Sequence, residues 1–145
     1  MMSGRGEILE NVSQPVAAAL RGRRVIIVKP PFGVATQDAY ALLAKSKAYV
    51  SASVAKQKLQ DWLSHPSSDP SLLGNTLESV VFNKYLALPV ALDEVARETG
   101  INFRMTGSGS ACFALCPAKF DPQAIAVILK RCWGDGVWIC ETEIL

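Results

Sequence analysis

The sequence has few of the residues that usually form metal sites. It contains one histidine, His65, and its four cysteines, Cys112, Cys116, Cys132 and Cys140, form no C-x-x-C pair. These spacings argue against a zinc site, which needs closely grouped cysteine and histidine ligands. Reduced thiols in the cytoplasm are the simplest interpretation of this cysteine usage.

An excess of charge of one sign is also lacking. Fifteen basic and thirteen acidic residues leave a net charge of +2, so no broad basic surface is expected for nucleic acid or an anionic membrane. No run of about eighteen uncharged apolar residues occurs that could form a membrane span. The first residues lack the apolar core of a signal peptide. We therefore expect neither nucleic acid nor a membrane as a partner.

What is present is enough apolar sequence for a folded core. Half of the 145 residues are hydrophobic and 19% are charged, the reverse of the balance in a disordered chain. No internal repeat and no second zone of composition is visible. The sequence therefore predicts a single domain over residues 1–145.

The apolar periodicity predicts an α+β domain. Short apolar or alternating runs predict strands at residues 25–28, 101–105, 111–116 and 137–140, of which 111–116 is apolar on both faces and therefore central. Helical spacing and cap residues predict helices that begin at or near Thr36, Ser51, Leu77, Pro89 and Asp121. We expect about four mostly antiparallel strands with helices packed on one face of the sheet.

Several other residues have structural interpretations. Asp38 and Glu78 lie near helix starts, where the helix dipole favours a carboxylate. Trp62, Trp133 and Trp138 are interpreted as packing residues. Residues 65–70 are expected to form a polar loop, and Gly4 to Glu7 resemble a turn between strands.

The most informative segment is the loop Met105–Ala111, with the sequence Met-Thr-Gly-Ser-Gly-Ser-Ala. Two glycines that alternate with hydroxyl residues allow positive φ, and successive N–H groups in such a loop can surround an anion. A tight hairpin connection would also require glycine. The pattern alone fits both interpretations, and both can hold together.

The segment Phe103–Ala114 resembles the third, C-terminal motif of the GHMP kinases, and its exact residues resemble the branch that phosphorylates diphosphocytidyl-methylerythritol. Three further segments are similar to that family in the same order: Gly6–Leu9, Val25–Tyr40 and Asn75–Glu78. The resemblance implies the ferredoxin-like C-terminal domain of a GHMP kinase, with residues 1–24 as a lead-in from an N-terminal half that is missing here.

The resemblance also implies roles for individual residues. The phosphate loop would comprise Gly107, Ser108, Gly109 and Ser110. Thr36 would contact the cytidine part of the substrate, and Tyr40 would stack on the cytosine ring, with Phe32 and Gln37 as weaker candidates beside them. From the residues alone, Thr36 could equally be a helix N-cap and Tyr40 a core tyrosine.

The segments that would bind ATP are absent. No Pro-x-x-x-Gly-Leu-Gly segment and no G-x-x-x-x-G-K-[ST] P-loop occurs in the sequence. The resemblance therefore implies ATP with Mg²⁺ as cofactors of a complete enzyme only, none bound to this chain alone. It implies no catalytic residue and no metal ligand within residues 1–145.

The resemblance implies that the chain is the substrate-side C-terminal half of an ATP-dependent 4-diphosphocytidyl-2-C-methyl-D-erythritol kinase. The complete enzyme would phosphorylate the 2-hydroxyl of its substrate in the non-mevalonate isoprenoid pathway. We expect this chain alone to be inactive. The substrate would be a cytidine diphosphate-linked sugar alcohol, and the protein partner the missing half or a second copy. A cloned fragment, a truncated gene product and a split enzyme all fit. Two alternatives stay open: another GHMP kinase, of homoserine or mevalonate type, and a stand-alone ligand-binding module.

Overall fold

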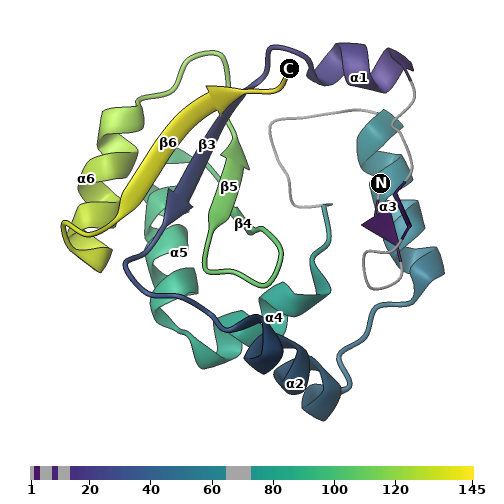
Figure 1. The fold of residues 1–145 in the computed structure, drawn as a ribbon. Helices are drawn as coiled ribbons and strands as arrows, with labels where there is room; N and C mark the ends of the chain where they lie inside the picture. The colour runs from purple at the N-terminus through teal and green to yellow at the C-terminus, as the bar shows by residue number, and fades with distance from the viewer. Residues whose placement is uncertain (1, 4–7, 10–13, 65–72) are drawn as a thin grey trace.

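A four-stranded antiparallel sheet is the centre of the fold (Figure 1). The computed structural model describes residues 2–3, 8–9, 14–64 and 73–145. Its main sheet has the order β4-β5-β3-β6 and comprises β3 (Arg24–Lys29), β4 (Arg104–Met105), β5 (Cys112–Leu115) and β6 (Trp138–Glu143). The predicted central strand is therefore confirmed, because β5 has a neighbour on each side.

The register of the two inner strands places one apolar face of the sheet in the core. Ile26 lies opposite Ala114 and Val28 lies opposite Cys112, and all four side chains are fully buried. The alternate positions of β3 point to the other face, where Val25 and Ile27 are partly exposed.

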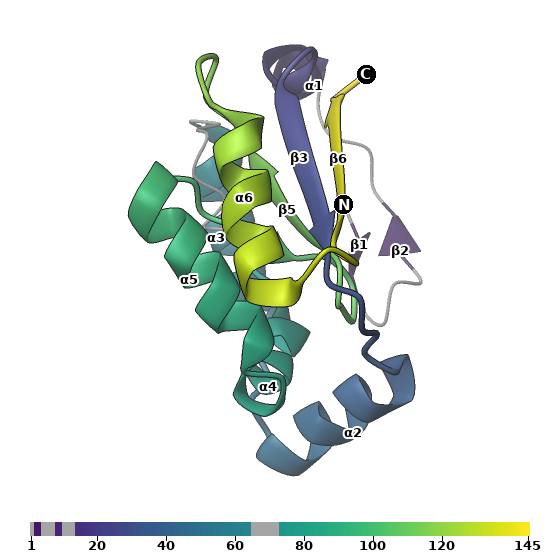
Figure 2. The same ribbon diagram turned by 90° about the vertical axis from the view of Figure 1, so that its left-hand side faces the viewer.

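Two helices, α5 (Ala87–Thr99) and α6 (Pro122–Trp133), cover the core face of this sheet (Figure 2). The helix α6 begins as the sequence predicts: the Asp121 carboxylate accepts a hydrogen bond from the Gln123 amide at 2.8 Å, and Pro122 follows in the first turn. Gly100, at φ +72°, ends α5. The expected α+β sheet with helices on one face is therefore confirmed.

A second pair of helices lies at the end of the sheet that carries the β4–β5 connection (Figure 1). They are α2 (Thr36–Ser46), which follows β3, and α4 (Thr76–Lys84). The buried side chains of α2 are Ala39 and Leu43, as its apolar spacing predicts.

The remaining described elements lie to the side of the main sheet (Figure 1). They are α1 (Gln14–Leu20), α3 (Ala52–Ser64) and an antiparallel pair of short strands, β1 (Met2–Ser3) and β2 (Ile8–Leu9). The predicted turn at residues 4–7 and the whole predicted polar loop at residues 65–70, with His65, lie outside the described residues. Of the helices described, none has both the length and the apolar character needed to cross a membrane.

Two predictions about local structure are wrong. Thr36 is the first residue of α2 and not its N-cap, which is Ala35 and makes no side-chain cap bond. Of the strand expected at residues 101–105, only β4 forms, because residues 101–103 lead the chain from the end of α5 to the sheet. Ile101 and Phe103 are nevertheless buried, as their alternation predicts.

Two predictions about burial also need correction. Trp62 and Trp133 are buried, but Trp138 is 52% exposed because it lies opposite Lys29 at the end of the edge strand β6, on the face away from the helices. Tyr40 is 46% exposed, so its interpretation as a core tyrosine is wrong.

Candidate functional site at the glycine loop

The glycine loop, residues 106–111, connects β4 to β5 as a tight hairpin. The Thr106 amide donates to the Ala111 carbonyl at 3.0 Å, and the Gly109 amide donates to the Thr106 carbonyl at 3.1 Å. Both glycines have positive φ, +58° at Gly107 and +83° at Gly109. The hairpin interpretation is therefore confirmed, and the glycines are required for backbone conformation.

The same loop leaves backbone donors unused at its tip. Within the part of the chain that the structure describes, the amides of Gly107 and Ser108 donate no hydrogen bond. Consecutive free N–H groups in a loop with positive φ are suited to an anion such as a phosphate. The geometry is therefore compatible with both interpretations of the glycine pattern.

The two serines of the loop contact the chain that follows β3: Ser110 contacts the connection to α2, and Ser108 contacts the first residue of α2. The hydroxyl oxygens of Ser108 and Thr36 are 2.8 Å apart, although the residues are separated by 72 positions in the sequence. The Ser110 hydroxyl donates to the Phe32 carbonyl at 2.6 Å, and its side chain is only 2% exposed. The structure thus brings the predicted phosphate loop against Thr36. Ser108 makes this contact, and the buried Ser110 binds the loop to the Phe32 backbone.

Tyr40 extends this site along α2. It lies one turn after Thr36, a spacing that places two side chains on the same side of a helix. Its exposed ring is free to stack on a planar ligand, whereas the Phe32 ring is already stacked on Tyr85, with 6.4 Å between ring centroids and 11° between planes. Gln37 is exposed, and its side chain makes no contact with the other site residues within the part of the chain that the structure describes.

Asn75, which no sequence pattern assigns to the site, holds the loop from its other side. Its side-chain oxygen accepts from the Leu77 amide at 3.1 Å and caps α4, as asparagine often does. Its side-chain nitrogen donates to the carbonyl oxygens of Met105 and Gly107, each at 2.8 Å. The cap could have been read from the sequence, but the contact with residues 30 and 32 positions away could not.

Glu78 is buried beneath the loop, with 8% of its surface exposed. Its carboxylate accepts from the Met105 amide at 2.7 Å and pairs with the Arg104 guanidinium at 2.9 Å. Burial raises the pKa of this carboxyl above its ordinary value, and the Met105 bond and Arg104 oppose that rise. The structural interpretation of Glu78 is confirmed, since both carboxylate oxygens are engaged.

The chemistry that these residues offer is binding. The site presents two backbone amides, the hydroxyls of Thr36 and Ser108 and the ring of Tyr40. The nearby thiol of Cys112 is a poor nucleophile, because burial raises its pKa to about 12. Among the residues that the structure describes, no three His, Cys, Asp or Glu side chains group as metal ligands would.

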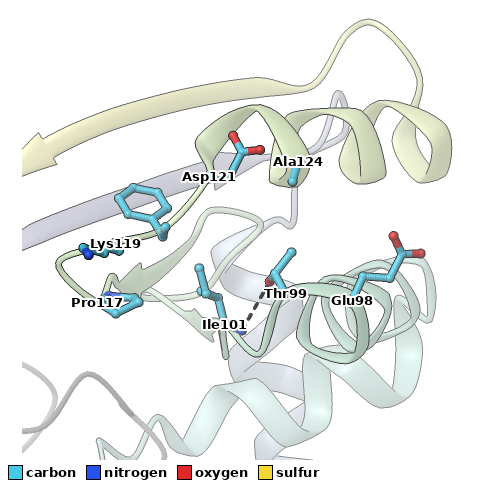
Figure 3. A pocket seen from close by; sticks show the side chains of 8 residues that line it. Glu98, Thr99, Ile101, Pro117, Lys119, Asp121 and Ala124 are labelled. Atoms are coloured by element: carbon cyan, nitrogen blue, oxygen red, sulfur yellow. Dashed lines mark hydrogen bonds between the residues drawn. The ribbon is translucent and has the colours of Figure 1, made fainter.

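A separate pocket of about 230 Å³ lies at the opposite end of β5 from the glycine loop (Figure 3). It is lined by Glu98, Thr99, Ile101, Pro117, Lys119, Phe120, Asp121 and Ala124. The Thr99 hydroxyl there already donates to the Val95 carbonyl and accepts from the Ile101 amide. None of the predicted site residues lines this pocket.

Comparison with known proteins gives the family and the fold of the chain. The family model described as GHMP kinases C terminal matches residues 56–135. A 4-diphosphocytidyl-2-C-methyl-D-erythritol kinase from Methylacidiphilum infernorum is 33% identical over 149 residues, which cover 100% of this chain and 47% of the relative. The protein of the same name from Synechococcus sp. (strain CC9311) is 32% identical over 151 residues, which cover 94% of this chain and 47% of the relative.

A solved structure gives the same result for the fold. The crystal structure of a 4-(cytidine 5'-diphospho)-2C-methyl-D-erythritol kinase matches with a TM-score of 0.67 and 22% identity, and covers 97% of this chain and 48% of that one. At this identity the likeness is evidence for the fold alone, and it confirms the predicted α+β arrangement. The chain spans about half the length of the curated relatives it matches.

Proposed function

The chain belongs to the GHMP kinase C-terminal family, and from this we propose that it is the substrate-side half of a 4-diphosphocytidyl-2-C-methyl-D-erythritol kinase. The observation that carries the proposal is the 2.8 Å contact between the hydroxyls of Thr36 and Ser108. That contact joins the segment expected to bind cytidine to the loop expected to bind phosphate. A cytidine diphosphate group has both parts side by side.

In this proposal each part of the ligand has its own partner. The cytosine ring stacks on the exposed ring of Tyr40, a contact worth about 1–3 kcal/mol in nucleic-acid systems. The Thr36 hydroxyl hydrogen-bonds the cytidine part. The loop of Gly107, Ser108, Gly109 and Ser110 lies against the phosphates, with the free amides of Gly107 and Ser108 as donors.

Phosphoryl transfer depends on positioning and on charge stabilisation of the phosphates. In the proposal, ATP with Mg²⁺ supplies the transferred phosphoryl group in a complete enzyme, and the ATP-binding residues belong to the other half. Residues 1–145 are then one domain, with 1–24 as its lead-in, and the chain alone does not turn over ATP. Its protein partner is that other half or a second copy of this chain. The proposed location is the cytoplasm, where four free thiols stay reduced.

The proposal is tested by the nucleotide preference of the chain. We expect calorimetric or NMR titration to give tighter binding of CDP than of UDP or ADP. Tyr40→Leu should weaken CDP binding about tenfold, as the loss of one stacked ring implies. Tyr49→Leu is the matched control, because Tyr49 is 64% exposed and lies outside the site.

Each outcome of the titration has a distinct meaning. Equal binding of CDP, UDP and ADP would contradict a cytidine site and favour another kinase of the family. Equal effects of the two tyrosine substitutions would contradict stacking on Tyr40. Substrate-dependent release of ADP by the isolated chain would contradict its proposed inactivity and leave the substrate assignment intact.

A further inference from the structure

Asn75 uses its whole side-chain amide to join α4 to the glycine loop. The oxygen caps the helix through the Leu77 amide, and the two N–H bonds of the nitrogen go to the carbonyls of Met105 and Gly107. Among the good N-cap residues, only asparagine can accept and donate in this way at once. Figure 1 shows the loop between β4 and β5 next to α4.

Glu78 completes the attachment from the same side of α4, three residues after Asn75. Its carboxylate accepts from the Met105 amide, so α4 residues hold both the N–H and the C=O of Met105. Met105 is 2% exposed. These bonds fix the start of the loop at Met105. The bond from Asn75 to the Gly107 carbonyl also fixes the peptide unit between Gly107 and Ser108.

The bond to the Gly107 carbonyl sets the direction of the next amide. The peptide bond between Gly107 and Ser108 is trans, so its C=O and N–H point in opposite directions. With the carbonyl turned toward Asn75, the Ser108 N–H must point away from α4. Among the described residues that N–H donates no hydrogen bond, and the Ser108 hydroxyl beside it contacts Thr36.

We propose that Asn75 is a positioning residue that aims the Ser108 amide at the phosphates of the ligand. The inference rests on the proposed function for the identity of that ligand, a nucleoside diphosphate. In this inference the start of α4 binds the carbonyls of Met105 and Gly107 and so keeps them away from the binding surface, where they would repel an anion. Asn75 itself does not touch the ligand.

Two substitutions separate this task from the helix cap. Asn75→Asp and Asn75→Ser keep an oxygen that can accept from the Leu77 amide, and both remove the side-chain nitrogen that donates to two loop carbonyls at once. Asp121→Asn is the matched control, since it makes the reverse exchange of amide and carboxylate at the cap of α6, where the Gln123 amide is the one partner of the side chain among the described residues. Urea denaturation shows whether each variant is folded.

Binding of two probes gives the first readout. We expect both Asn75 variants to weaken CDP binding by about tenfold or more, because a hydrogen bond to a charged group contributes more than one between neutral groups, and to leave cytidine binding unchanged. Asp121→Asn should change neither. Equal losses for CDP and cytidine, or no loss for either, would overturn the inference.

The second readout needs no ligand. In ¹⁵N relaxation and hydrogen exchange, the amides of Gly107 and Ser108 should become more mobile in both Asn75 variants, while the Leu77 amide stays protected. Unchanged loop amides would overturn the inference even where CDP binds. Failure of the unsubstituted chain to bind CDP would contradict the proposed function. It would also contradict the phosphate role of Asn75, regardless of the mobility measured for the Gly107 and Ser108 amides.

Discussion

Gly109 is the position in the glycine loop with no room for a side chain. A Cβ atom there would lie 2.7 Å from the Met105 sulfur, which is buried, and the residue has a φ of +83°. Gly107 also has positive φ, but a Cβ there would meet nothing within 4 Å. The two glycines therefore differ in packing and share the same backbone requirement.

We expect Gly109→Ala to destabilise the chain more than Gly107→Ala. The left-handed conformation costs each alanine about 1–2 kcal/mol, and overpacking adds about 1–3 kcal/mol at Gly109 alone. Urea denaturation measures both free energies of unfolding. Equal losses for the two variants would show that Met105 moves freely out of the way, contrary to this account.

Glu78 makes stability depend on pH in the unusual direction for a carboxyl group. Because burial raises its pKa in the folded chain, the folded state binds the proton more tightly than the unfolded state between the ordinary pKa and the raised one. The free energy of unfolding contributed by this group therefore falls as pH rises through that interval. The charged group that acts on it is Arg104, which opposes the rise.

Glu78→Gln should remove this component and keep an oxygen for the Met105 amide. We expect the stability of the unsubstituted chain relative to the variant to decrease as pH rises from about 4.5, the ordinary value, toward neutrality. Denaturation curves at several pH values measure the difference. A difference that increases with pH would mean that the Arg104 pair outweighs burial.

At the scale of the elements, α6 illustrates what local sequence can predict. Its start follows from Asp121 and Pro122, and its inward face follows from Ile125, Ile128 and Leu129, all of which are buried. Caps and helical spacing act within one or two turns, so the sequence alone shows them. The N-cap of α2 was missed because Ala35 has no capping side chain and only backbone geometry marks it.

The two faces of α6 should respond very differently to truncation. Leu129 is fully buried, so Leu129→Ala should cost about 2–5 kcal/mol of unfolding free energy through lost contacts and a cavity. Val127 is 64% exposed on the same helix, and Val127→Ala should change stability by less than about 0.5 kcal/mol. Similar losses at both positions in thermal or urea unfolding would contradict the packing of α6 against the sheet.

At the scale of the whole molecule, the site is made by contacts between distant segments. The glycine loop was identifiable from its own residues, and Thr36 and Tyr40 came from a family resemblance. The loop contacts the start of α2 because β3 pairs antiparallel with β5. This pairing places the last residues of β3, which lead to α2, beside the first residues of β5, which follow the loop. Asn75 has no local signal for its loop contact, because that contact exists only when α4 packs beside the β4–β5 connection.

The four thiols provide a test of this packing across the molecule. Cys112 and Cys116 are buried, and burial raises their pKa values to about 12 and about 11. Cys132 is exposed and Cys140 is partly exposed on β6. The thiolate is the reactive form of cysteine. The rise in the pKa of Cys112 from 9.0 to about 12 lowers the fraction of that thiol present as thiolate about a thousandfold.

We expect a thiol reagent such as DTNB to label only Cys132 and Cys140 rapidly in the native chain at pH 8, and all four cysteines in denaturant. Replacing Cys132 and Cys140 by serine should abolish the rapid phase and leave two thiols that react only as the chain opens. Cys112 begins β5 directly after the glycine loop, so its labelling rate reports opening of that hairpin. Rapid labelling of Cys112 in the doubly substituted chain would contradict a rigid attachment of the loop to Asn75, Glu78 and Phe32.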